Sequence, residues 1–182
     1  VGVPATRDAL FLKSIAPGLS AETLTGGLDE NLKRMAHGDV NGLIMPASVL
    51  IGLERRNLIE DLLDAALFPP ASGQGSQALI TREDDDASIE LAYTLQHRPS
   101  FDRVRAERSF VHALEADNGQ IMAQDGAHAI GALATVSTDG ELTLFGAVVA
   151  TDGTLLQATT SGEAAEAVDI GQELAQDFRA QL

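Results

Sequence analysis

The stretch Phe68-Pro69-Pro70-Ala71-Ser72-Gly73-Gln74-Gly75 divides the chain into two differently patterned halves. Its consecutive prolines lack backbone donors and fix φ, and the glycines on either side of Gln74 allow backbone conformations that other residues avoid. We therefore expect no helix or strand to run through it. The stretch is either a connector between two domains or a loop that presents Gln74 to a ligand in a cleft, and residue types alone leave both interpretations open.

Composition excludes several classes of function. The 182 residues are enough for one large or two small domains with an apolar core. A net charge of −15 argues against nucleic acid or an anionic membrane as partner, because phosphate binding needs clustered positive charge. No cysteine is present, which excludes disulfides, thiolate metal sites and cysteine nucleophiles.

The N-terminus and the length of the apolar runs indicate the expected location of the protein. No apolar run approaches the roughly 20 residues that span a bilayer, and no signal segment precedes the first strand. We therefore expect a soluble, cytoplasmic protein with no membrane partner. Because the chain starts with Val1 inside an apolar, strand-like segment, we also expect that this is not the natural start.

Short strands alternate with helices in the first half, a pattern that predicts an α/β lobe with a largely parallel sheet. The expected strands are 1–3, 22–24 and 42–45, and the expected helices are 8–15, 28–37, 48–53 and 58–67. Residues Ala9, Leu12 and Ile15 should form the apolar face of the first helix, and Ser48 should cap the third. Residues 76–82 are typical of a strand that precedes an acidic run at 83–86.

The second half predicts a small α+β domain. The expected helices are 87–95, 99–115 and one that begins at Ser161-Gly162, and the expected strands are 129–136, 142–149 and 155–159. The dipeptides Asp139-Gly140 and Asp152-Gly153 are strong hairpin signals. The three strands should therefore form an antiparallel meander.

Residue chemistry alone does not predict an enzyme. The histidines do not have metal-ligand spacing: His37, His97, His112 and His128. The acidic run is more typical of a solvated loop than of a cation site, so no metal is expected. Thr25-Gly26-Gly27 precedes a helix and has the form of an anion site, but Asp29 and Glu30 in the first turn repel an anion.

Several segments together resemble one family. Pro70-Ala71-Ser72-Gly73-Gln74-Gly75 followed by Arg82 matches its proline-alanine, glycine-glutamine-glycine loop, and Ala106-Glu107-Arg108 matches its alanine-glutamate-arginine helix motif. The spacing of Leu32, Gly38, Gly42-Leu43-Ile44-Met45, Leu50 and Leu53 also fits, as does the C-terminal meander. In this order the motifs resemble hydroxymethylbilane synthase, also called porphobilinogen deaminase, over nearly the whole chain.

The resemblance implies a three-domain enzyme of tetrapyrrole, porphyrin and heme biosynthesis. Such an enzyme is a transferase that joins porphobilinogen units on a dipyrromethane cofactor held by a cysteine. Residues 1–75 would then be an incomplete periplasmic-binding-protein-like α/β lobe that resembles domain 2, and residues 76–96 a crossover strand and acidic linker helix. Residues 97–182 would be the C-terminal α+β domain.

The chain departs from the family pattern in three ways. The first domain with its catalytic aspartate is absent, so no catalytic residue is carried over. Of the residues that contact substrate or cofactor, only Arg7, Gly26 and Gln74 are retained. The cysteine that carries the cofactor is replaced by Ala127 or, in a second alignment, by Gly119.

These departures define the functional hypotheses. The first is a degenerate hydroxymethylbilane synthase-like protein that binds porphobilinogen or a bilane, carries no attached dipyrromethane and is inactive alone. It would need a missing N-terminal domain or a partner chain. The alternative is a non-catalytic ligand-binding or protein-interaction module derived from that family. A fragment with no independent role is the third possibility, and it predicts an unpaired strand at 76–82.

Overall fold

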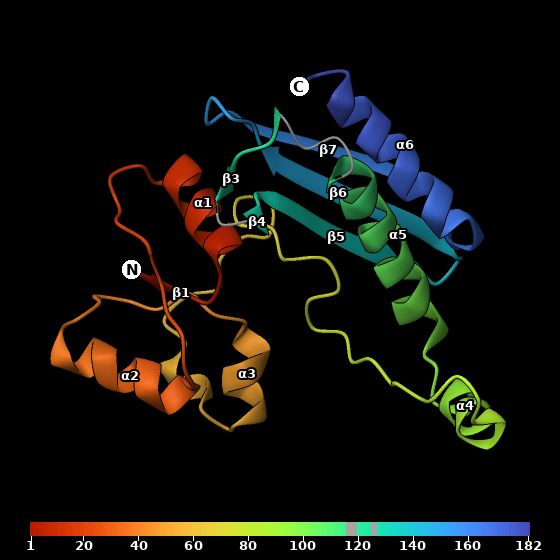
Figure 1. Ribbon diagram of the computed structural model, residues 1–182, viewed down its shortest axis with the longest axis horizontal. Helices are drawn as coiled ribbons and strands as arrows, with labels where there is room; N and C mark the ends of the chain where they lie inside the picture. Colours follow the sequence, from red (N-terminus) through yellow and green to blue (C-terminus); the bar gives the residue numbers. More distant parts are fainter. Residues whose placement is uncertain (116–119, 125–126) are drawn as a thin grey trace.

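The computed structural model describes residues 1–115, 120–124 and 127–182, and it shows a mixed α/β chain with a three-stranded antiparallel sheet (Figure 1). Its helices are α1 (Thr6–Ile15), α2 (Leu28–His37), α3 (Ala47–Gly52), α4 (Asp86–Thr94), α5 (Arg98–Glu115) and α6 (Ala167–Arg179), with 3₁₀ turns at Arg56–Leu58 and Ala164–Glu166. Its strands are β1 (Gly2–Val3), β2 (Glu22–Thr23), β3 (Ala123–Gln124), β4 (Ala127–His128), β5 (Ile130–Val136), β6 (Glu141–Val149) and β7 (Leu155–Glu163).

The predicted meander is confirmed as the antiparallel sheet β5-β6-β7. Gly140 and Gly153 have φ of +86° and +89° in its two turns, a left-handed conformation that glycine adopts without a steric penalty. The last strand is longer than predicted, because Ser161 and Gly162 pair with Thr143 and Leu142 of β6. The final helix therefore begins at Ala167 and not at 161–162.

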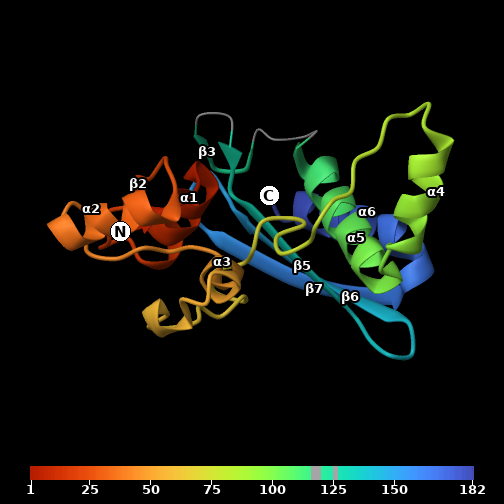
Figure 2. The same cartoon turned by 90° about the horizontal axis from the view of Figure 1, so that it is seen from below.

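Helices α5 and α6 cover one face of this sheet (Figure 2). Side chains from both helices meet alternate residues of β6 in a closed core, and the largest of them are Phe110, Leu114, Leu142, Leu144, Leu174 and Phe178. Phe110 and Phe178 meet edge to face at 5.3 Å between ring centroids. A Cβ on Gly171 would lie 2.5 Å from the carbonyl oxygen of Ala106, so this glycine lets α6 approach α5 closely.

Helix α1 packs on the opposite face of the sheet and thereby joins the two halves. Leu10 and Phe11 contact the other set of alternating β6 residues, including Ala147 and Val149. The sequence predicted the face Ala9, Leu12 and Ile15 for this helix. In the structure only Leu12 of these is buried; the buried face is shifted toward Leu10 and Phe11, which the sheet covers, and Ile15 is 36% exposed.

The first half has much less regular structure. Strands β1 and β2 pair in parallel, as predicted, but the expected strand at 42–45 contributes only an isolated parallel bridge between Leu43 and Gly2. Helix α2 ends at Gly38 with φ +86° and buries none of its residues. None of the described helices combines the length and the apolar character needed to cross a lipid bilayer.

Three local predictions in this half are wrong. Ser48 lies inside α3, whose N-cap is Pro46. The helix expected at 58–67 does not form; Asp61 and Asp64 accept hydrogen bonds from nearby backbone N–H groups of Leu62 and Ala66, which compete with helical bonds. The segment 76–82 is extended but unpaired, because the described part of the chain offers it no neighbouring strand.

Candidate functional site

The loop 69–75 is fixed along the free edge of β5. Strand β6 pairs with one edge of β5, and the groups that point outward on the other edge belong to Ile130, Ala132 and Ala134. The N–H of Ala132 donates directly to the Pro70 carbonyl at 3.1 Å. The other two groups bind charged side chains that also hold the loop. An irregular segment and two side chains thus take the place of a fourth strand.

Arg7 is the first of these side chains. From the start of α1, its Nε donates to the Ile130 carbonyl at 2.6 Å, and its Nη2 donates to the Pro69 and Pro70 carbonyls. Its Nη1 donates to Asp8 at 2.7 Å, and its guanidinium lies 4.6 Å from the centre of the Phe11 ring. Burial lowers the pKa of Arg7, and the Asp8 carboxylate opposes that shift.

The neighbouring Asp8 completes this ion pair in a buried position. Burial raises the pKa of its carboxyl group, and the charge and hydrogen bond of Arg7 counteract this shift. The guanidinium is therefore surrounded by fixed acceptors, so binding a ligand carboxylate would require it to release some of them. The structure places Arg7 between the two halves of the chain.

Glu107 is the second anchoring side chain. One carboxylate oxygen accepts from the Ala134 N–H at 2.9 Å, and the other accepts from the Gly73 N–H at 2.7 Å. Burial raises the pKa of this carboxyl group, while the two hydrogen bonds and the charge of Arg103 oppose the shift. Glu107 therefore joins the loop, α5 and β5 through one group.

The sequence contains a pattern that indicates the anchoring role of Glu107. Glu107 lies on the same face of α5 as the apolar residues Ala106, Phe110 and Leu114, which are all buried. A carboxylate on the apolar face of a helix needs buried donors, because an unpaired buried charge is very costly. Its function as an anchor could therefore have been suspected.

Close packing adds to the polar contacts. Pro69 is fully buried against Gly131, where an added Cβ would lie 2.5 Å from the Pro69 ring and 2.7 Å from Nη2 of Arg7. Only glycine permits this approach of the loop to β5.

Gln74 lies at the exposed tip of the anchored loop. Its Oε1 accepts from the Ala71 N–H at 3.1 Å, so the side chain folds back over its own turn. The flanking Gly73 and Gly75 have φ of +74° and +83°. The loop is fixed up to Gly73, and the extended segment 76–82 follows directly, with Ile80 93% exposed.

The other predicted site residues lie in different places. Gly26, with φ +106°, precedes α2 at a position where an added Cβ would lie 2.4 Å from the Glu30 carboxylate, and α2 lies on the side of α1 away from the sheet (Figure 1). Ala127 belongs to β4 and pairs with Gln124 of β3, while Gly119 lies outside the described residues. Arg7 and the Gln74 loop thus meet near the start of β5, and Gly26 lies in a separate part of the lobe.

Attachment of a cofactor and binding of a metal ion each require particular side chains. A dipyrromethane held through a thioether needs a cysteine, and the chain has none, so its residues do not fit covalent attachment of that group. In residues 1–115, 120–124 and 127–182, no three histidine, aspartate or glutamate side chains gather closely enough to hold a metal ion.

Comparison with known families matches almost the entire chain. Residues 1–90 match the profile described as porphobilinogen deaminase, dipyromethane cofactor binding domain. Residues 101–180 match the profile of the porphobilinogen deaminase C-terminal domain. The two profiles occur in succession, on either side of the start of α5.

Curated relatives agree with these profiles. The chain is 40% identical over 179 residues to a porphobilinogen deaminase of Deinococcus radiodurans and 38% identical over 178 residues to one of Thermus thermophilus. These alignments cover 98% and 97% of this chain, but only 55% and 56% of the relatives. The chain therefore spans about half the length of the curated relatives that it matches, and by both comparisons it belongs to the porphobilinogen deaminase family.

Proposed function

We propose that this chain is the domain 2 and domain 3 portion of a hydroxymethylbilane synthase-like protein of tetrapyrrole biosynthesis, with a cytoplasmic location. The observation that carries the proposal is the succession of the two family profiles over residues 1–90 and 101–180. In this proposal the chain binds porphobilinogen or a bilane, and the family's polymerisation of porphobilinogen requires parts that this sequence does not contain.

The proposed domain boundaries follow the same division. Residues 1–75 form an incomplete periplasmic-binding-protein-like lobe, residues 76–96 a crossover segment with a linker helix, and residues 97–182 the C-terminal domain. Parallel bonds among β1, β2 and Leu43 support the first assignment, since parallel strands joined by helices are typical of α/β lobes. The gap between the profiles at 91–100 overlaps only the end of the proposed linker, since the first profile extends to residue 90.

Gln74 is the strongest candidate for ligand contact. It is exposed at the tip of a loop that Arg7 and Glu107 hold from both sides, and a fixed support lowers the entropy lost when a ligand binds. Gly26 would contribute backbone contacts. Arg7 would contribute mainly by shaping the loop, because carbonyl and carboxylate oxygens already receive its donors.

The chain alone is expected not to turn over porphobilinogen. Covalent catalysis through a thioether-linked cofactor requires a sulfur atom, which the sequence lacks. A first domain, in the same polypeptide or from a partner chain, would supply the missing aspartate. Its contact surface would lie on the segment that follows the Gln74 loop, where the apolar residues Leu79, Ile80, Leu91 and Leu95 are exposed.

Turnover and binding assays test this proposal separately. Purified protein is mixed with porphobilinogen, and uroporphyrin is recorded after oxidation; signal above an empty-vector control would overturn the predicted inactivity. Calorimetric titration with porphobilinogen then measures binding to the wild type, to Gln74→Ala and to the control Gln96→Ala, which changes an exposed glutamine on another segment. Weaker binding in Gln74→Ala alone supports the assignment, whereas equal binding in all three contradicts it.

A further inference from the structure

The outer face of α5 carries a narrow basic and aromatic stripe, formed by Arg98, Phe101, Arg105, Arg108 and His112. At 3.6 residues per turn these five positions fall within an arc of about 80°. The buried residues Ala106, Phe110 and Leu114 lie on a different side of the helix, together with Glu107, which binds the Gln74 loop. The stripe is therefore the part of α5 that neither the sheet nor the loop covers.

The arginines in the centre of the stripe do not have partners in the described chain. Arg98 binds Asp102 at 2.7 Å, but neither Arg105 nor Arg108 forms an ion pair or hydrogen bond within residues 1–115, 120–124 and 127–182. This is unexpected in a chain with 27 acidic and 12 basic residues. At physiological salt the Debye length is about 8 Å, so carboxylates farther away than this are largely screened from the stripe.

Phe101 gives the stripe an apolar centre. Its side chain is 42% exposed, and the guanidinium carbons of Arg98 and Arg105 lie 5.9 Å and 5.4 Å from its ring centre. Among the large apolar side chains that are exposed in the described chain, it is the one that lies after residue 98. Guanidinium groups held over an aromatic ring lose less freedom when they bind a carboxylate.

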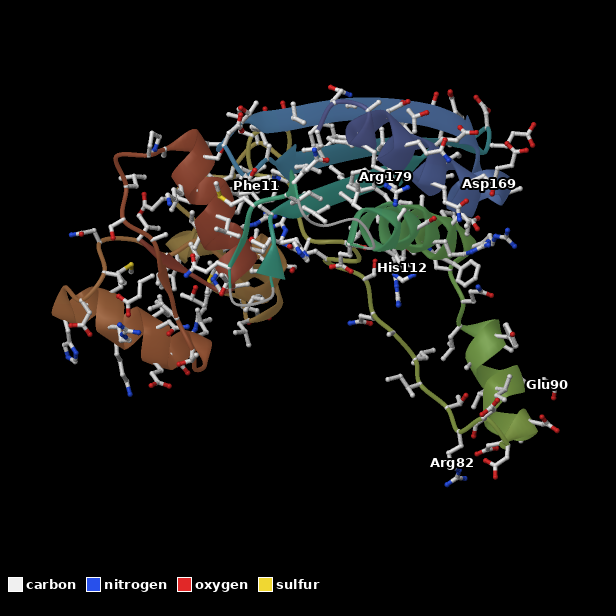
Figure 3. All side chains as sticks on the ribbon, turned by 45° about the horizontal axis from the view of Figure 1, so that its top comes forward. Phe11, Arg82, Glu90, His112, Asp169 and Arg179 are labelled. Atoms are coloured by element: carbon white, nitrogen blue, oxygen red, sulfur yellow. The ribbon has the colours of Figure 1, made fainter. Side chains whose placement is uncertain are left out.

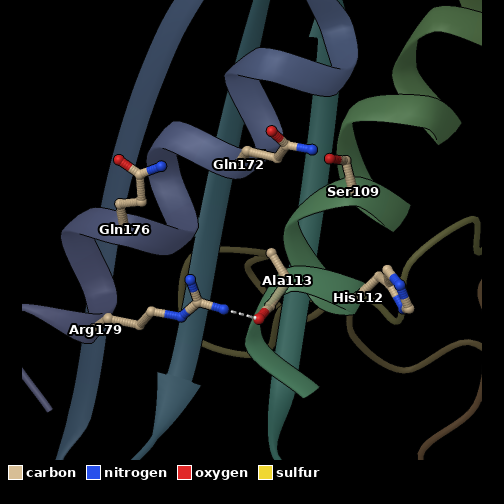
Figure 4. A pocket seen from close by; sticks show the side chains of 6 residues that line it. All are labelled: Ser109, His112, Ala113, Gln172, Gln176 and Arg179. Atoms are coloured by element: carbon tan, nitrogen blue, oxygen red, sulfur yellow. Dashed lines mark hydrogen bonds between the residues drawn. The ribbon is translucent and has the colours of Figure 1, made fainter. Parts of the chain in front are cut away.

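A recess between α5 and α6 adjoins the stripe (Figure 4). It measures about 210 Å³ and is lined by Ser109, His112, Ala113, Gln172, Gln176 and Arg179. Gln172 points toward Ser109, Arg179 donates to the Ala113 carbonyl, and His112 projects from the outer side of α5 (Figures 3 and 4). The recess thus offers amide donors from α6 and shares His112 with the stripe.

We propose that the stripe and the adjoining recess bind a small organic polycarboxylate. Arg105 and Arg108 are about 4.5 Å apart along the helix axis, a separation that carboxylates on a short carbon chain can bridge. Each guanidinium can bind one carboxylate in bidentate fashion. The size of the recess and the charge of the stripe favour a compact anion over a long acidic peptide. The proposal does not depend on the proposed function, because it involves a different face of the molecule.

Citrate is the probe for the test, and calorimetry and two-dimensional NMR are the measurements. We expect citrate to bind the wild type and to shift the amide signals of residues 105–112. The double variant Arg105→Ala/Arg108→Ala should bind at least about tenfold more weakly, since it loses two charge-assisted bidentate contacts. The control Lys33→Ala/Arg56→Ala removes equal charge from other exposed positions and should change affinity less than about twofold.

Three outcomes would overturn the proposal. The first is the absence of citrate binding at millimolar concentrations in low salt. The second is equal weakening in the two double variants, which would show a response to net charge alone. The third is stronger binding of an oligo-glutamate peptide than of citrate, because the surface would then fit an acidic protein. Thermal unfolding of both double variants verifies that the comparison uses folded protein.

Discussion

The C-terminal domain and the first half of the chain differ in how well they bury their apolar side chains. In the C-terminal domain, Phe110, Leu142, Leu144 and Phe178 have no exposed surface. Between α1 and residue 98 most large apolar residues are exposed, and all the exposed ones in the described chain except Phe101 precede residue 98. The C-terminal domain therefore contains its own core, whereas the first half depends on surfaces outside itself.

The C-terminal sheet is one surface against which the first half packs. Phe11 of α1 is fully buried against the back of the C-terminal sheet, and Arg7 and Glu107 fix the intervening loop to β5. The two halves are thus joined at α1 and this loop, and we expect stability to decrease from the C-terminal core, across this joint, to the far end of the first half. The following substitutions test this gradient.

The largest expected effect comes from matched leucine substitutions in the two regions. Leu114 is 1% exposed in the C-terminal core and Leu62 is 69% exposed in the first half. Leu114→Ala should lower the free energy of unfolding by about 2–5 kcal/mol, because it removes buried methyl groups and leaves a cavity. Leu62→Ala should change it by less than about 0.5 kcal/mol. Urea unfolding followed by circular dichroism measures both, and similar losses would contradict the comparison.

The second-largest loss of stability is expected from a substitution at the joint between the halves. Gly131→Ala places a methyl group 2.5 Å from Pro69 and should destabilise the protein by about 1–3 kcal/mol through overpacking. It should also speed hydrogen exchange at the Ala132 amide, which binds the Pro70 carbonyl. Gly42→Ala is the control, since nothing lies within 4 Å of its added methyl group. Unchanged exchange at Ala132 would show that the loop tolerates displacement.

Glu107 should make the stability of the joint depend on pH. Glu107→Gln keeps one acceptor but presents an NH₂ group to the other backbone donor. This should lower the free energy of unfolding by about 1–3 kcal/mol. Because burial raises the pKa of Glu107, the folded state binds a proton more readily than the unfolded state. The carboxyl group's contribution to stability is therefore lost as pH rises through its folded pKa. It is fully present below about pH 4.3, the ordinary value for glutamate.

The difference in unfolding free energy between wild type and Glu107→Gln should accordingly widen as pH falls. Urea titrations at several pH values measure this difference. The effect of Asp8 on the pH dependence is common to both proteins and cancels in the difference. Glu115→Gln, on the exposed side of α5, is the control and should change stability by less than about 0.5 kcal/mol at each pH. A difference that does not vary with pH would mean that Glu107 titrates as an exposed carboxyl group.

The smallest effect on stability is expected at the unanchored end of the first half. Ile80 is 93% exposed on an unpaired extended segment, so Ile80→Ser should alter unfolding by less than about 0.5 kcal/mol. It should instead reduce self-association at high concentration, because unpaired extended segments with apolar side chains add to one another. Sedimentation velocity compares it with Leu19→Ser, an exposed leucine outside this segment. A wild type that remains monomeric would remove the basis for this prediction.

Local signals predicted the C-terminal domain well. Asp-Gly turns at 139–140 and 152–153 specify hairpins through glycine conformations, and Pro99 correctly indicated the first turn of α5. The first half was predicted less well, because the helix at 58–67 and the strand at 76–82 depend on packing partners that the described chain does not provide. Propensity without burial does not stabilise a short element.

The candidate site was predicted only in part. The proline-glycine stretch correctly identified an irregular segment, but contacts from residues 62 and 34 positions away hold it in place, and no local pattern contains these. Arg7 was predicted as a ligand contact, and its bonds to backbone carbonyls depend on the docking of α1 against the sheet. The resemblance selected Arg7 and the Gln74 loop as candidates, and their contacts are visible only in the tertiary structure.

The loop on the edge of β5 also bears on the solubility of the molecule. An open strand edge invites a second molecule to extend the sheet, and natural proteins commonly block such edges with charges, prolines or covering segments. Here Pro69 and Pro70 cover the edge, and a buried arginine and a buried glutamate bind the outward-facing groups of Ile130 and Ala134. The same contacts that hold the Gln74 loop thus protect the β5 edge of the sheet against pairing with a second molecule.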